Sequence, residues 1–290
     1  MPSSFFLLSM GQGDPCLRFD GPNHLRLALN TQDGPVAVTL KHRGDEIQAD
    51  LVGDGQSWIA DHLSELIGLQ YPPPRFEVPR RLREIAHRFQ GMRIPRLPCI
   101  SARLVQIILQ QLVSFRDACH GWRQLVHRFG QPVPGHEDLW FPPGPDILRR
   151  PVSHQFVECG ILPQHGRRIV EAMRHSSKIE ACWNAGRDPE SLECTCELML
   201  RIPGIGEWSI GFLRGAGLGD PDAVVLGDYS HPKHVSYFFT GNTTAEDKEM
   251  LRLLEPYRPH RFYVLALLLK GSPPAPRQGT RRRSIRGRFR

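Results

Sequence analysis

The chain has 290 residues, of which 40% are hydrophobic and 8% aromatic, a composition typical of a folded protein and not of a disordered one. No apolar run approaches the roughly 18 residues that a membrane span needs, and the apolar stretch 5–8 lacks the length and the basic lead-in of a signal peptide. We therefore expect a cytoplasmic protein without a membrane partner.

The formal net charge of +7 resides in the C-terminal tail, because residues 271–290 hold seven arginines and no acidic residue. The remainder of the chain is neutral as a whole, so its bulk charge does not indicate nucleic-acid binding. The tail also holds three prolines, and we predict that it is disordered. Such an arm either adds salt-sensitive phosphate contacts or is a solvated appendage.

The first 75 residues predict a small β domain. The ranges 25–29, 36–40 and 47–52 alternate in hydrophobicity, and turn signals separate them, which predicts an antiparallel sheet. A helix is expected over residues 57–67, closed by Gly68.

Residues 76–270 predict a helical body. Apolar residues recur at three- and four-residue steps from Leu104 to Phe129, which indicates one long amphipathic stretch. A sheet followed by helices predicts the α+β class. Further helices are expected near 165–175, 189–200, 207–216, 229–239, 245–254 and 260–270.

Seven cysteines show no paired-ligand spacing, and an odd number argues against a disulfide framework, so we expect reduced thiols. Cys194 and Cys196 are two apart on a predicted helix and do not share a face. We predict no metal site there.

The segment Leu200–Trp208 predicts a tight hairpin between two helices, over the range 189–216. Gly204 and Gly206 can adopt positive φ, and Ile205 can plug the angle between the helices. The backbone N–H groups of residues 204–207, which end at Glu207, would then face a DNA phosphate. The alternative is an ordinary glycine-rich turn.

An aliphatic run ends at Gly227-Asp228-Tyr229, ahead of another helical pattern and 22 residues after Gly206. With the hairpin, this aspartate resembles that of the helix-hairpin-helix DNA glycosylase superfamily, in particular the bacterial 3-methyladenine DNA glycosylase II (AlkA-like) branch. The resemblance runs from about Leu104 to Leu269. It implies an N-terminal antiparallel β domain and a helical glycosylase body.

The resemblance further implies a monofunctional DNA glycosylase of base excision repair that removes alkylated purines, of the 3-methyladenine type, from duplex DNA. Asp228 would stabilise the positively charged sugar of the transition state and position the attacking water. Without that role, Asp228 would be a helix N-cap. The partner would be double-stranded DNA with damaged bases, the protein would be a monomer, and no organic cofactor is implied.

Two rival functions remain at this stage. The same machinery could remove deaminated or oxidised bases, or the chain could be a non-catalytic helix-hairpin-helix module that only binds DNA. Superfamily members that also cleave the DNA backbone carry a lysine two residues after the last hairpin glycine, and this lysine forms a Schiff base. This chain has Trp208 there, and we expect no lyase activity. Lys233 is the lysine nearest to Asp228 in sequence. It could in principle act in a lyase reaction, and the alternative is that its side chain is merely solvated.

The resemblance assigns DNA contacts to further residues. Gln111 and Leu112 match the pair that fills the gap left by a flipped base, although Leu112 also fits the apolar core stripe. The base pocket would comprise Trp208, Phe212 and His260, of which the last two depart from the AlkA-like tyrosine and tryptophan. Trp208 and Phe212, four residues apart, could instead be packing residues.

A monovalent cation could bind the hairpin carbonyls of Ile202 and Ile205. His231 and His234 frame the helix after Asp228, and we interpret them as phosphate or water contacts because no third metal ligand is evident.

Overall fold

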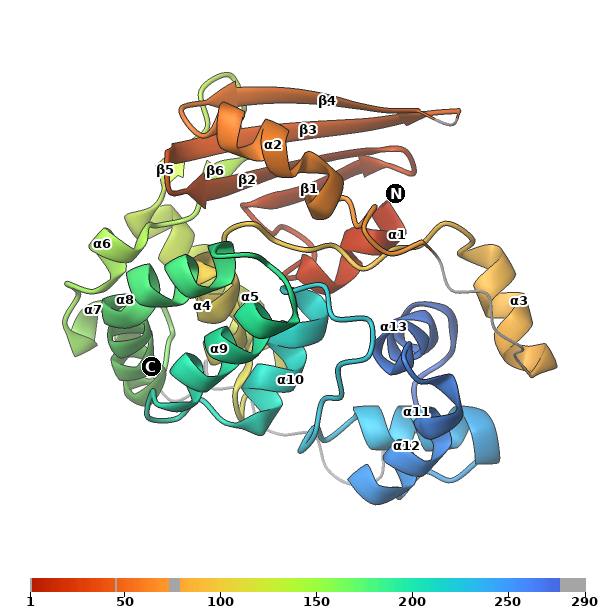
Figure 1. Cartoon of the computed structure of the whole chain (residues 1–290). Coiled ribbons are helices and arrows are strands. Elements are labelled where there is room, and N and C mark those ends of the chain that lie inside the picture. The colour runs from red at the N-terminus through yellow and green to blue at the C-terminus, as the bar shows by residue number, and fades with distance from the viewer. Residues whose placement is uncertain (1, 45, 73–78, 277–290) are drawn as a thin grey trace.

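The computed structural model describes residues 2–44, 46–72 and 79–276 (Figure 1). The predicted disorder of the tail concerns mainly residues 277–290, which lie outside this range. Within the described residues, no helix has both the length and the apolar composition needed to cross a lipid bilayer.

An antiparallel sheet of four strands forms at the N-terminus, in the order β1-β2-β3-β4. Three of these strands were predicted, and β1 was missed because its five residues do not alternate between buried and exposed and only four of them pair with β2. The expected helix over residues 57–67 forms as α2 (Gln56–Leu66), which packs on β3 and β4 (Figure 1). The strands are β1 (Leu17–Gly21), β2 (His24–Thr31), β3 (Gly34–Arg43) and β4 (Glu46–Gly53).

Successive side chains of a strand point to opposite faces of the sheet, and the two faces pack against different parts of the protein. Leu27 and its partner Val38 belong to the main core, which the sheet shares with the helices. Ala28 and its partner Ala37 pack with Phe141 of the short β5–β6 hairpin (Gln131–Pro132 and Trp140–Phe141). Both faces are thus covered, and the sheet is anchored to the body.

The rest of the chain is helical (Figure 1). The short helices at the N-terminus are α1 (Pro2–Phe5) and η1 (Phe6–Leu8). The helices of the body are α3 (Arg80–Arg88), α4 (Ser101–Gln110), α5 (Phe115–Phe129), α6 (Pro145–Leu148), α7 (Ser153–Glu158), α8 (Pro163–Asn184), α9 (Pro189–Leu200), α10 (Glu207–Ala216), α11 (His231–Thr240), α12 (Asp247–Leu254), η2 (Glu255–Tyr257) and α13 (Arg261–Gly271).

The prediction of one amphipathic stretch over 104–129 is wrong, because a loop at residues 111–114 separates α4 from α5. Leu112 adopts a φ of +57° in this break, which a helix cannot contain. Ser114 then restarts the helix, since its side chain accepts a hydrogen bond from the N–H of Asp117. The apolar period concealed the break because α4 and α5 bury their apolar residues in the same core.

The expectation that all cysteines are reduced is also wrong. Cys182 in α8 and Cys194 in α9 form a disulfide bond, 12 residues apart. The periodicity of each helix says nothing about which faces meet, so the pairing arises only from the packing of α8 on α9. The other five cysteines are free, as expected.

Reduction of this disulfide is expected to lower the free energy of unfolding by about 3 kcal/mol, because a closed loop of this length restricts the unfolded chain. Urea denaturation with and without dithiothreitol measures the difference. Cys182→Ser should show the same loss and no response to dithiothreitol. Equal stability of the oxidised and reduced wild-type protein would contradict the expectation.

Candidate active site

The predicted helix-hairpin-helix is present as α9, the turn 201–206 and α10. Gly204 has a φ of +87°, and a Cβ atom there would collide with the side chain of Arg168. Glycine is therefore required at this position for both conformation and space. Ile205 is buried in the main core and anchors the turn, as expected.

The backbone donors of the turn are partly used. The N–H of Ile205 donates to the carbonyl of Ile202 at 3.0 Å, so this predicted phosphate donor is already engaged. The N–H groups of Gly204, Gly206 and Glu207 bond to no other described residue and form the open end of the hairpin. An unsatisfied helix N-terminus attracts anions, and phosphate binding stays a prediction. The cation site also stays a prediction, with the Ile202 carbonyl already accepting one bond.

Leu112 is not a core residue, because it is 73% exposed in the loop between α4 and α5. The left-handed backbone conformation at this position holds an apolar side chain largely in solvent. Exposure is compatible with insertion into DNA, which stays a prediction. Phe115, which belongs to the apolar stripe in the sequence, is likewise 53% exposed and begins α5 just after this loop.

Gln111 faces inward and connects this loop to the hairpin. Its amide nitrogen donates to the Gly204 carbonyl at 2.9 Å and to the Ser209 hydroxyl at 2.8 Å. Its amide oxygen accepts a hydrogen bond from Arg168 at 2.6 Å. Gln111 is thus buried and positions Leu112 relative to the hairpin, and only Leu112 of the predicted pair is exposed. Arg168, from α8, was not predicted.

Asp228 lies three residues before the first residue of α11, and its two carboxylate oxygens have different partners. Oδ1 accepts hydrogen bonds from the N–H groups of Ser230 and His231 and from the Ser230 hydroxyl, at 2.7–2.9 Å. Although Ser230 is the N-cap residue, this oxygen binds the first N–H of α11 and so performs the capping role considered as the alternative. Oδ2 accepts a hydrogen bond from the indole N–H of Trp208 at 2.9 Å. Capping therefore accounts for one oxygen, and the other links the aspartate to the hairpin helix.

This environment keeps Asp228 ionised. Burial alone would raise its pKa, but His231 and the hydrogen bonds from Trp208 and the backbone outweigh burial and lower the pKa to about 2. Burial lowers the pKa of His231 itself, so His231 is neutral at neutral pH and the N–H donors then hold the carboxylate. In the structure, Nδ1 of His231 lies 3.8 Å from Oδ1 of Asp228. The sequence indicated only that the two residues are neighbours in the chain.

The pH dependence of stability should reveal this ionisation. Because the folded pKa of about 2 is below the ordinary value of 3.8, Asp228 stabilises the fold above pH 4, and this contribution disappears as the pH falls through 2. We expect it to reach about 2 kcal/mol. The measurement compares urea denaturation of the wild type and Asp228→Asn between pH 6 and pH 2.5. A difference between them that does not shrink with acid would contradict the assigned pKa.

Aromatic rings form a stack behind the aspartate. Trp208 and Phe212 are nearly parallel, with ring centroids 5.6 Å apart, and Phe212 in turn lies 6.2 Å from His231. Phe212 is only 9% exposed, so in this structure it supports the partly exposed Trp208 and does not itself present a face to solvent. Arg103 was not predicted here, and its guanidinium lies 5.3 Å from the Phe212 centroid.

Two further residues were considered in the sequence, His260 and Lys233. His260 precedes α13, a helix that packs on α11, and its place in a base pocket stays a prediction. Lys233 places its ammonium 3.4 Å from the ring centroid of Tyr229, an exposed residue next to Asp228. Across the described residues, no group of three or more His, Cys, Asp and Glu side chains could hold a metal ion.

Comparisons with known proteins extend these observations. No family model matches the chain, and neither does any curated protein. Among solved structures, a 3-methyladenine DNA glycosylase of Archaeoglobus fulgidus is similar, with 20% identity and a TM-score of 0.73 over 92% of this chain and 93% of the other. An 8-oxoguanine glycosylase/lyase of Clostridium acetobutylicum in complex with DNA has 11% identity and a TM-score of 0.69 over 93% and 90%.

A 3-methyladenine DNA glycosylase of Schizosaccharomyces pombe, in complex with abasic DNA, has 17% identity and a TM-score of 0.52, over 68% of this chain and 92% of the other. The similar structures thus act on different damaged bases. What they share with this chain is the fold. The chain therefore has the fold of the helix-hairpin-helix DNA glycosylases.

Proposed function

We propose that the protein is a monofunctional DNA glycosylase of base excision repair, which hydrolyses the N-glycosidic bond of an alkylated purine flipped out of duplex DNA. The observation that carries this proposal is the Asp228 carboxylate, which is held ionised before α11 and bonded to Trp208 on the helix that follows the hairpin.

A fixed carboxylate suits this reaction because the sugar acquires positive charge as the base departs. One unit charge about 4 Å from C1′ contributes roughly 4 kcal/mol at an effective dielectric constant of 20. Such a contribution corresponds to about a thousandfold in rate. A base such as 3-methyladenine already carries positive charge in DNA and leaves without protonation, so Asp228 needs no general acid beside it.

The surrounding residues supply the remaining requirements. The open N–H groups of Gly204, Gly206 and Glu207 are suited to a DNA phosphate. Leu112 is exposed on the loop that Gln111 joins to this hairpin, where it can fill the space of an extruded nucleotide. Because Trp208 occupies the position of the lyase lysine, the product would be an abasic site with an intact backbone.

A second candidate is removal of a neutral base, deaminated or oxidised, by the same machinery. The guanidinium of Arg103 favours it, because a cation 5.3 Å from Phe212 makes this end of the aromatic stack less attractive to a positively charged base. The two candidates differ only in the base pocket and share the role of Asp228.

The test is release of free base from duplex DNA by the wild-type protein. One substrate is methylated DNA, scored for 3-methyladenine and 7-methylguanine, and the others contain one hypoxanthine, uracil or 8-oxoguanine. Release of the methylated purines without strand cleavage supports the first proposal. Release of a neutral lesion alone supports the second. Tight binding to duplex DNA with no release of base from any substrate would contradict both proposals and would indicate a non-catalytic DNA-binding protein.

A further inference from the structure

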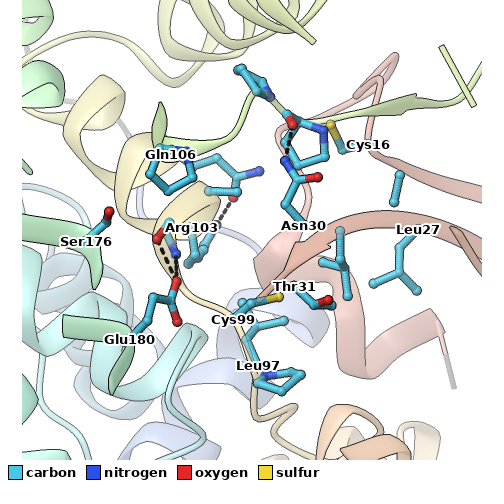
Figure 2. Close-up of a pocket in the computed structure, with 18 of the residues that line it drawn as sticks. Cys16, Leu27, Asn30, Thr31, Leu97, Cys99, Arg103, Gln106, Ser176 and Glu180 are labelled. Atoms are coloured by element: carbon cyan, nitrogen blue, oxygen red, sulfur yellow. Dashed lines mark hydrogen bonds between the residues drawn. The ribbon is translucent and has the colours of Figure 1, made fainter. Parts of the chain in front are cut away.

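A cavity of about 420 Å³ lies between the sheet and the helical body (Figure 2). Its walls come from β2, the start of α4, the second half of α8 and residues 142–146. Neither Asp228 nor Trp208 lines it, although Arg103 in its wall also contacts Phe212 behind Trp208. The size of the cavity and its lining indicate a second site beside the candidate active site.

The lining of the cavity has the composition of a small-molecule site. Most of it is apolar, including Leu27, Leu97 and Trp122, while a few polar side chains converge from different elements. Figure 2 shows Gln106 and Arg103 on α4, Asn30 on β2 and Glu180 on α8 around the same space.

One of these side chains offers the cavity a donor that no described group accepts. Arg103 is 3% exposed and donates to the Gln106 amide oxygen at 2.9 Å and to the Leu7 carbonyl at 2.7 Å, and it thereby holds the Gln106 side chain in place. The amide nitrogen of Gln106 donates to no described residue. A buried donor without an acceptor costs stability, so an acceptor supplied by a ligand would be favoured.

Another side chain offers an acceptor. Asn30 donates through its amide nitrogen to the Pro142 carbonyl, and its amide oxygen accepts nothing from the described residues. Glu180 uses Oε1 for the N–H groups of Ile100 and Ser101 and for the Ser101 hydroxyl, and it thereby fixes the start of α4 in the cavity wall. The cavity lining thus holds an unused amide donor on α4 and an unused amide acceptor on β2.

The charges of the cavity exclude a strongly ionic occupant. The cation of Arg103 faces only neutral acceptors, but the carboxylates of Glu180 and Asp14 lie in the same lining. Asp14 is satisfied by the N–H groups of Met10, Cys16 and Trp122. An anion would approach two carboxylates and a cation would approach the guanidinium, so a neutral molecule with both donors and acceptors fits best.

We propose that this cavity binds a small neutral heterocycle whose ring edge alternates N–H and C=O groups, as in a free uracil base. A ring carbonyl accepts from the Gln106 amide nitrogen, and a ring N–H donates to the Asn30 amide oxygen. The flat ring packs on the apolar wall around Trp122.

The test is isothermal titration calorimetry of the full chain with uracil and with 1,3-dimethyluracil, which keeps the carbonyls and lacks the N–H donors. We expect uracil to bind with a Kd below about 1 mM and dimethyluracil at least tenfold more weakly. Equal affinity for the two ligands, tighter binding of benzoate than of uracil, or no heat with folded protein would overturn the proposal.

Variants locate the binding site. Gln106→Met removes the amide, and Ala181→Trp narrows the exposed mouth of the cavity without touching its polar groups, so each should weaken uracil binding at least about tenfold. Trp208→Ala should bind uracil as the wild type does. Loss of binding in Trp208→Ala with retention in Ala181→Trp would assign the base to the candidate active site and overturn the proposal. Circular dichroism checks that every variant is folded.

Discussion

Asp228→Asn is expected to slow release of methylated purines from duplex DNA by about a thousandfold, the loss that follows from removing one fixed charge beside the developing cation. Asparagine is a good helix cap, so its side-chain oxygen can still accept from the N–H groups of Ser230 and His231. The hydrogen bond from Trp208 is lost, because the amide N–H₂ that replaces Oδ2 cannot accept it. The change therefore removes charge while it preserves the local backbone.

Single-turnover rates on methylated duplex DNA measure this effect, and DNA affinity should stay within about threefold of the wild type. Asp247→Asn is the matched control, because Asp247 is a carboxylate of the same region that accepts from the N–H of Gly227. We expect less than a tenfold effect from this control. A wild-type rate for Asp228→Asn would reduce Asp228 to a helix cap.

Leu112→Ala is expected to slow base release from duplex DNA by roughly 10- to 100-fold, because burying a leucine side chain in the emptied stack contributes about 1.5–3 kcal/mol. The folded protein should be almost as stable as the wild type, since the Leu112 side chain is 73% exposed. The effect should be absent on single-stranded DNA, where no stacked partner strand resists extrusion of the base.

The measurement compares single-turnover rates on one methylated sequence, as duplex and as single strand. Leu69→Ala is the matched control, since Leu69 is also an exposed leucine and lies outside the hairpin and the candidate active site. Equal slowing on both DNA forms would show that Leu112 acts on the chemistry or on the pocket and not on base extrusion.

The dual use of Asp228 explains why sequence reasoning left two interpretations of this residue. A Gly-Asp pair before a helix is typical of a cap, and Oδ1 does cap α11. The bond from Trp208 to Oδ2 joins residues 20 apart in sequence, and no local pattern predicts it. The same holds for Gln111, whose amide reaches Gly204 across 93 residues.

The sequence by itself determined the local features. These are three of the four strands of the N-terminal sheet, most of the helices, the hairpin and an aspartate before a helix. These follow from hydrophobic period, capping residues and glycine conformation, which act over a few neighbouring residues. Only the tertiary structure decided which side chains meet. Leu112 became exposed, Phe212 became buried behind Trp208, and Cys182 met Cys194, because helices with equal periodicity pack in different ways and only long-range contacts select one.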